Sequence, residues 1–90
     1  MRPTFAELRE KSNQNLGDFL KTEVKLGMTF LRSAKYHKGR GNVEHYEISK
    51  RNAIAALNAI DRFKDRLPAD TRTEIETGRS ELAQAISALL

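Results

Sequence analysis

A four-residue string in the middle of the chain, Gly39-Arg40-Gly41-Asn42, separates two long segments whose apolar residues recur every three or four positions. Two glycines so close together end an α-helix, because glycine adopts positive φ at no steric cost, and Asn is a favoured cap for the helix that follows. A link of about four residues between two long helices makes them run antiparallel. The string therefore predicts a helical hairpin, and we call it the hinge.

Apolar spacing also gives the extent of each helix. The first long segment covers 16–38 and the second covers 43–66, where Leu67-Pro68 ends it because proline cannot continue the backbone hydrogen bonds. A third amphipathic segment covers 71–89, and no segment shows the period of two that is typical of strands. We expect an all-α protein, with a three-helix antiparallel bundle in residues 16–90.

Each expected helix has an apolar seam that predicts the core. The three seams consist of Leu20, Val24, Gly27, Leu31 and Ala34; of Val43, Tyr46, Ala53, Leu57, Ile60 and Leu67; and of Ile75, Leu82, Ile86 and Leu89. Phe19, Leu26 and Phe30 widen the first seam. Glycine inside a helix costs about 1 kcal/mol relative to alanine, so Gly27 indicates a close approach by a neighbouring helix.

Residues 1–15 are expected to form an N-terminal extension, and the chain is expected either to break or to bend where it joins the bundle. A short helix is predicted over 4–12, where Phe5 and Leu8 share one face. The following Ser12-Asn13-Gln14-Asn15 consists of poor helix formers that prefer caps, which predicts a weak joint.

Several classes of protein are excluded by composition. The chain has no cysteine, which excludes disulfides, thiolate zinc sites and cysteine catalysis. No apolar run approaches the roughly 18 residues that a membrane span needs, and the first twenty residues lack the apolar core of a signal peptide. We therefore expect a cytoplasmic protein that has no membrane partner.

The net charge of +4 comes entirely from residues 32–51 around the hinge. That stretch has two acidic residues, Glu44 and Glu47, against six basic ones. The six are Arg32, Lys35, Lys38, Arg40, Lys50 and Arg51. They are the candidate binding residues for an RNA or DNA backbone, with Tyr36 and Tyr46 as stacking groups.

Two histidines flank the hinge and raise two chemical hypotheses. His37 and His45 could bind a metal together with Glu44 or Glu47, but they lack the i, i+4 spacing of a helical metal pair, so we expect neither metal nor cofactor. The spacing of Arg40 and His45 resembles the ribonuclease motif of HEPN domains. That resemblance implies that Arg40 would hold a phosphate and His45 would act on the ribose hydroxyl.

A broader resemblance covers roughly residues 28–60. Gly41-Asn42 at the turn, Ala53-Ile54 twelve residues later, and Leu31 and Ala34 before the turn resemble the helical hairpins of tetratricopeptide repeats and of microtubule-interacting-and-trafficking domains. Tyr46 stands where those hairpins have a small residue. The chain is also similar to small bacterial helical proteins. The resemblance implies a scaffold that binds a peptide or helix in a groove.

These observations favour a protein-interaction module without catalytic residues, which binds a partner helix or peptide or associates with itself. The alternative is an RNA- or DNA-binding protein that uses the basic hinge, and a HEPN-like ribonuclease is the third hypothesis.

Overall fold

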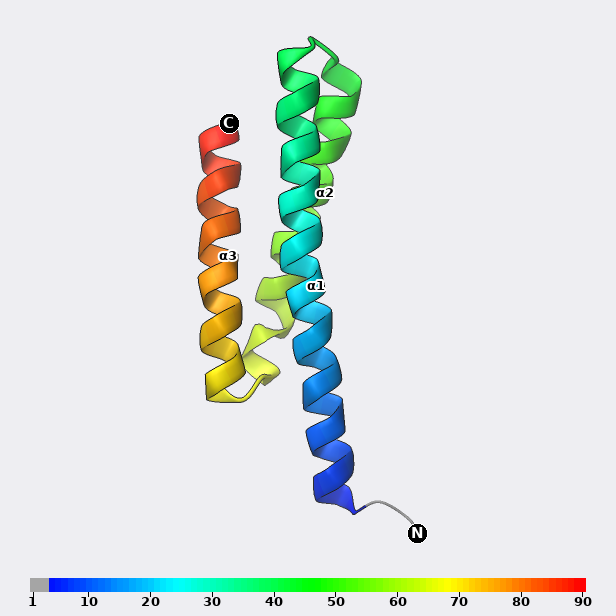
Figure 1. Cartoon of the computed structure of the whole chain (residues 1–90), viewed down its shortest axis with the longest axis vertical. Coiled ribbons are helices and arrows are strands. Elements are labelled where there is room, and N and C mark those ends of the chain that lie inside the picture. The colour runs from blue at the N-terminus through cyan, green and yellow to red at the C-terminus, as the bar shows by residue number, and fades with distance from the viewer. Residues whose placement is uncertain (1–3) are drawn as a thin grey trace.

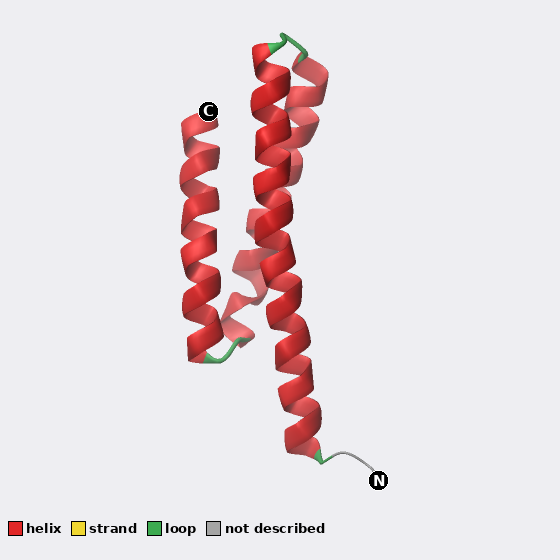
Figure 2. Ribbon diagram, in the orientation of Figure 1, coloured by secondary structure: helices red, strands yellow, loops and turns green. Residues whose placement is uncertain are grey.

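The computed structural model describes the backbone of residues 4–90 and the side chains of Thr4 and residues 14–90. Three long helices follow one another: α1 (Phe5–Gly39), α2 (Val43–Phe63) and α3 (Ala69–Leu89), with one turn of 3₁₀ helix, η1 (Lys64–Arg66), after α2. α1 and α2 form an antiparallel hairpin, and α3 packs along it (Figures 1 and 2). The expected all-α three-helix bundle is confirmed.

The helix boundaries differ from the prediction most at the N-terminus. The expected short helix over 4–12 and the helix over 16–38 are one continuous helix of 35 residues, α1. Ser, Asn and Gln each cost well under 1 kcal/mol relative to alanine inside a helix, which is too little to break one that has neither glycine nor proline at that point. Phe5 and Leu8 are helical in backbone, and their side chains lie outside the described part of the chain.

The other two helices differ by a few residues. The segment predicted as 43–66 ends its α-helix at Phe63 and continues as η1. The third helix begins at Ala69, ahead of the predicted 71, because Pro68 in an extended conformation occupies the cap position. Proline has no backbone N–H to leave unpaired there, so it suits a helix start.

The hinge ends α1 through a Schellman motif. Gly41 has a φ of 73°, and its N–H donates to the carbonyl of Lys38. The N–H of Asn42 donates to the carbonyl of His37 at 2.9 Å. Asn42 also caps α2, since its side-chain oxygen accepts a hydrogen bond from the backbone N–H of His45. Gly41 therefore supplies the left-handed residue on which the reversal of the chain depends.

Three contacts give the register of the hairpin. Near the far end, the rings of Phe19 and Phe63 meet edge to face with centroids 6.5 Å apart. Fourteen residues further along α1, Ser33 Oγ lies 3.0 Å from Ser49 Oγ, which is fourteen residues back along α2. The pair His37 and His45 continues the same offset next to the hinge. α1 and α2 are therefore in contact along the whole length of α2.

The three helices converge at Gly27. A Cβ atom at this position would lie 2.6 Å from Leu82 Cδ2 of α3 and 3.3 Å from Ala56 Cβ of α2. The predicted close approach is confirmed, and it involves both neighbours at once. A second glycine, Gly78 of α3, lets Val24 approach within 3.0 Å of where its Cβ would stand.

Most of the predicted seam residues are buried. The buried apolar residues are Leu20, Leu31, Ala34, Ala53, Ala56, Ile60, Leu67, Ile75, Leu82, Ile86 and Leu89. Val43 was predicted on the buried seam, but it is exposed, because it begins α2 at the hinge. Phe19 and Leu26 were expected to widen the core, but each is nearly half exposed. Tyr46, expected on the buried seam, is half-buried against the core.

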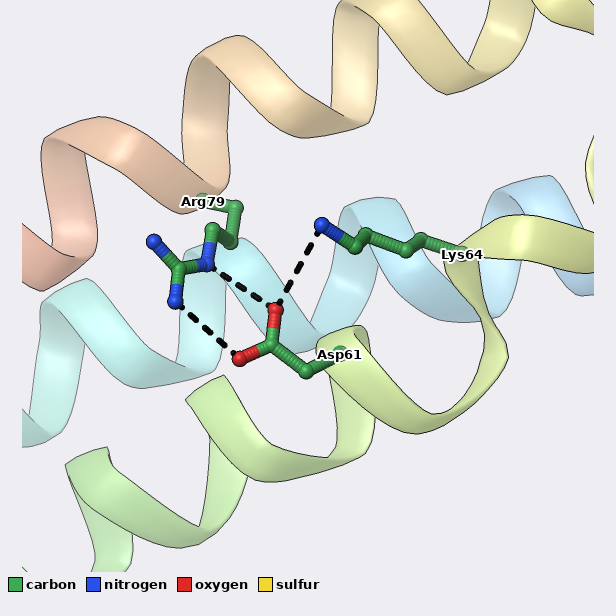
Figure 3. A network of polar contacts seen from close by, with 3 residues as sticks. All are labelled: Asp61, Lys64 and Arg79. Carbon is green, nitrogen blue, oxygen red and sulfur yellow. Dashed lines mark hydrogen bonds and ion pairs between the residues drawn. The ribbon is translucent and has the colours of Figure 1, made fainter.

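An ion pair joins α2 to α3 (Figure 3). The guanidinium of Arg79 donates two hydrogen bonds to the carboxylate of Asp61, from Nε at 2.9 Å and from an Nη at 3.1 Å. Lys64 lies 3.8 Å from the same carboxylate. The hydrogen bond from Arg79 holds the pKa of Asp61 below its ordinary value despite burial, and the charges of Arg79 and Lys64 lower it further.

The N-terminal part of α1 extends beyond the turn between α2 and α3 (Figure 1). Of the α1 residues whose side chains are described, Gln14 and Asn15 are exposed, and Leu16 and Gly17 are the first that pack against the other helices.

We expect Gly27→Leu to lower the free energy of unfolding by about 1–3 kcal/mol, since the new side chain would overlap Leu82 and Ala56. Urea denaturation followed by circular dichroism measures the loss. Gly39→Ala is the matched control, because nothing lies within 4 Å of its Cβ position. An unchanged or raised stability of Gly27→Leu would contradict the three-helix contact.

Deletion of residues 1–14 is expected to leave the bundle folded, since among the described side chains of α1 the core packing begins at Leu16. Thermal melting of the truncated chain should remain cooperative, with helical circular dichroism reduced only in proportion to the residues removed. A broad, non-cooperative melt would show that the deleted segment belongs to the core.

The free energy of unfolding should fall in acid, and protonation of Asp61 should account for part of that loss. Because the pKa of Asp61 is lower in the folded chain than in the unfolded one, its pair with Arg79 stabilises the fold above about pH 4, and this contribution is lost as the pH falls through the folded-state pKa. Urea midpoints of the wild type and Asp61→Asn should therefore differ at pH 7 and converge as the pH falls below the folded-state pKa of Asp61. A difference that does not depend on pH would contradict this role.

Candidate functional site

The six basic candidates around the hinge do not form one patch. Lys38 Nζ donates to the carbonyl of Leu89 at 2.9 Å, so it caps the C-terminal end of α3. Lys50 Nζ lies 2.9 Å from a carboxylate oxygen of Glu47. Both lysines also lie over the ring of Tyr46. These two charges are thus engaged within the bundle.

The four basic residues that remain are spread over α1, the hinge and α2. Arg40 stacks on the ring of Tyr36, 5.6 Å from its centroid. Arg32 and Lys35 are exposed on α1, and Arg51 is exposed on α2. Ser49 of α2 contacts α1, and Arg51 follows it by two residues. Two residues correspond to a rotation of about 200° around the helix axis, so the Arg51 side chain points away from α1. A phosphate backbone along one side of the hairpin would therefore meet only some of these charges.

The two histidines are brought together, but not as a metal site. Their rings stack with centroids 5.0 Å apart and an angle of 26° between their planes. Nearly parallel rings direct their in-plane lone pairs side by side, whereas a shared metal needs them to converge at about 2 Å. Among the residues that the structure describes, no three His, Asp or Glu side chains are grouped closely enough to hold a metal ion.

Arg40 and His45, the pair that resembles the HEPN motif, have different neighbours. Arg40 is stacked on Tyr36, and His45 on His37. A depression of about 230 Å³ lies beside them at the end of the hairpin. It is lined by His37, Lys38, Gly41, Asn42, Val43, Tyr46 and Glu47. Neither Arg40 nor His45 is part of this lining, so the depression does not join them into one site.

A different surface has the character of a binding site. Phe19 is 45 % exposed, Leu26 is 42 % exposed and Ile48 is 45 % exposed. Phe19 and Leu26 are seven residues apart on α1 and so share one side of it, next to α2. Ala55 is exposed seven residues after Ile48 on α2. We call the surface that bears these four side chains the open face.

The open face lies on the side of the hairpin that α3 does not cover. On α1, Leu26 lies about 200° around the helix from Val24, which packs against Gly78 of α3. On α2, Ile48 lies about 220° around the helix from Asp61, which pairs with Arg79 of α3. The open face is therefore an apolar surface of a two-helix layer, and no third element of the described part of the chain lies on top of it.

Most other residues of the open face are uncharged. Between the apolar side chains stand Thr22, Thr29, Ser33, Asn52 and Ala59. The half-buried Glu23 borders them, and the exposed Arg62, seven residues after Ala55, continues the face along α2. The hydroxyls of Thr22 and Thr29 donate to the carbonyls of Asp18 and Lys25. The serine hydroxyl bonds to Ser49. Because each of these hydroxyls already takes part in a hydrogen bond within the chain, a partner that covers them would break none of these bonds.

Sequence reasoning placed two of the open-face residues in the core and did not single out Ile48. The seven-residue spacing of Phe19 with Leu26 is the same as that of buried residues such as Ile75, Leu82 and Leu89, so spacing alone could not separate the open face from the core. Among the described helices, none is long and apolar enough to cross a membrane.

Comparison with known proteins gives no relative from which a function could be carried over. No family model, no curated protein and no solved structure matches the chain.

Proposed function

We propose that this chain is a small helical protein-interaction module, without catalytic activity, that binds a partner helix on the open face. The observation that carries the proposal is the exposure of Phe19, Leu26 and Ile48 along one mostly uncharged side of the hairpin. Large apolar side chains that are contiguous on a surface are typical of interaction sites. An amphipathic helix is the natural ligand, because its apolar face fits between two parallel ridges of side chains.

Nucleic-acid binding through the basic hinge is the alternative. Its support is Arg40 stacked on the exposed Tyr36, close in sequence to Arg32 and Lys35. It is weaker because Lys38 and Lys50 are engaged within the bundle and Arg51 points away from α1. The resemblance to tetratricopeptide-type hairpins implies a groove that binds a helix or peptide. We include that resemblance in the proposal of an interaction module.

Fluorescence anisotropy with two sets of labelled probes separates the two functions. The probes are a panel of amphipathic helical peptides, and single-stranded RNA and duplex DNA. We expect peptides to bind wild type and Lys35→Gln/Lys38→Gln/Arg40→Gln equally, with little dependence on salt. Leu26→Asp should lose the peptides, whereas Val43→Asp, which changes an equally apolar exposed residue off the open face, should keep them.

The nucleic-acid alternative predicts the opposite result. RNA or DNA would then bind the wild type and dissociate steeply with added salt, because each phosphate contact contributes nearly one unit to the slope of log K against log salt. The triple variant would lose that binding and Leu26→Asp would keep it. Such an outcome would overturn the interaction-module proposal.

A further inference from the structure

We infer that the open face binds a second copy of this chain, with the two hairpins packed face to face and related by a two-fold axis perpendicular to the helices. This inference rests on the proposed function and names its partner. Three features of the described residues support it: the spacing of the apolar side chains, the charge of the hinge and the size of the face.

The apolar side chains are spaced symmetrically about the middle of the hairpin. Leu26 is next to Gly27, which packs against Ala56 and so marks a common level on α1 and α2. Phe19 lies seven residues from Leu26, about 10 Å toward the end of the hairpin opposite the hinge. Ile48 lies eight residues from Ala56, about 12 Å toward the hinge. A two-fold axis at the level of Leu26 therefore brings Phe19 of each copy to the level of Ile48 of the other.

This arrangement fills the interface evenly. Its outer layers each combine one Phe19 with one Ile48, and its central layer combines Leu26 and Ala55 from both copies. A two-fold axis parallel to the helices would instead place both Phe19 rings beside both Phe63 rings at one end, and Ile48 beside Ser33 at the other. The first end would be overfilled and the second underfilled, which costs stability at a packed interface. The perpendicular axis also brings Glu23 to the level of Asn52 of the second copy, whose amide can donate to the carboxylate.

The charge distribution favours the same orientation. Residues 32–51 carry the whole net charge of +4 and lie at the hinge end. A parallel dimer would bring two such ends together. In the antiparallel dimer the hinges stand at opposite ends, separated by several times the Debye length of about 8 Å, so that their repulsion is screened.

The open face is large enough for a dimer, though not for a tight one. α2 has 21 residues and is thus about 31 Å long, and two adjacent helices are about 20 Å wide, which gives roughly 600 Å² per copy. The total of about 1,200 Å² is at the lower limit for specific interfaces. We therefore expect a reversible dimer with a dissociation constant in the micromolar range.

Sedimentation of the full-length chain tests the dimer. Between about 10 μM and 1 mM the wild type should pass from monomer to dimer. Leu26→Asp would place two carboxylates against each other at the axis and should weaken association at least about 100-fold. Val43→Asp is the control and should dimerise like the wild type. Circular dichroism checks that each variant is folded. Ile48→Asp is a second substitution on the open face and should also weaken association.

Cross-linking tests the orientation, because the chain has no cysteine of its own. A bismaleimide, which bridges thiols that are too far apart for a disulfide, should link an equal mixture of Phe19→Cys and Ile48→Cys into the mixed pair in preference to either homodimer, while Leu26→Cys should link to itself. Links of Phe19→Cys mainly to itself would overturn the antiparallel arrangement.

The two proposals fail in different ways. A chain that is monomeric at 1 mM but binds helical peptides, and loses them on Leu26→Asp, would overturn the dimer and leave the proposed function standing. A dimer unaffected by both Leu26→Asp and Ile48→Asp would use another surface and would overturn this inference. Absence of both self-association and peptide binding would overturn both proposals.

Discussion

The contact of three helices at Gly27 is the constraint on which the rest of the structure depends. The absence of a side chain there lets Leu82 of α3 and Ala56 of α2 both reach the backbone of α1. Above and below this point, α2 follows α1 closely through the stacked histidines, the paired serines and the edge-to-face phenylalanines. α3 is held at one side of the hairpin by Gly78 and by the pair of Asp61 with Arg79.

This one-sided placement of α3 decides which surfaces are available for binding. Three helices cannot cover both sides of a two-helix layer, so one side of the hairpin stays exposed. On that side most of the large residues are apolar and the hydroxyls are paired internally, which lowers the cost of removing the surface from water. A fourth helix, or the hairpin of a second copy, would complete a four-helix arrangement of the kind that buries such seams.

The hinge has a structural role that accounts for much of its chemistry. Lys38 caps the end of α3, Asn42 caps α2, and the two histidines stack across the turn. Lys50 is paired with Glu47. Some of the basic residues that give the hinge region its net charge therefore stabilise the end of the bundle. The other basic residues lie on α1, in the hinge and on α2.

Local signals in the sequence were enough to determine the helices, the hinge and most of the core, because period, caps and chain breakers act between residues that are near in sequence. Gly41 with positive φ, Asn42 as a cap and the buried stripe from Ile75 to Leu89 are of this kind. The continuity of α1 through residues 12–15 was not determined locally, since those propensities are too weak to decide between a bend and a helix. Only the tertiary structure decided which side of the hairpin α3 covers. Phe19 and Leu26 have the same apolar character as the buried residues, and their exposure follows from where another helix packs, which no local pattern encodes.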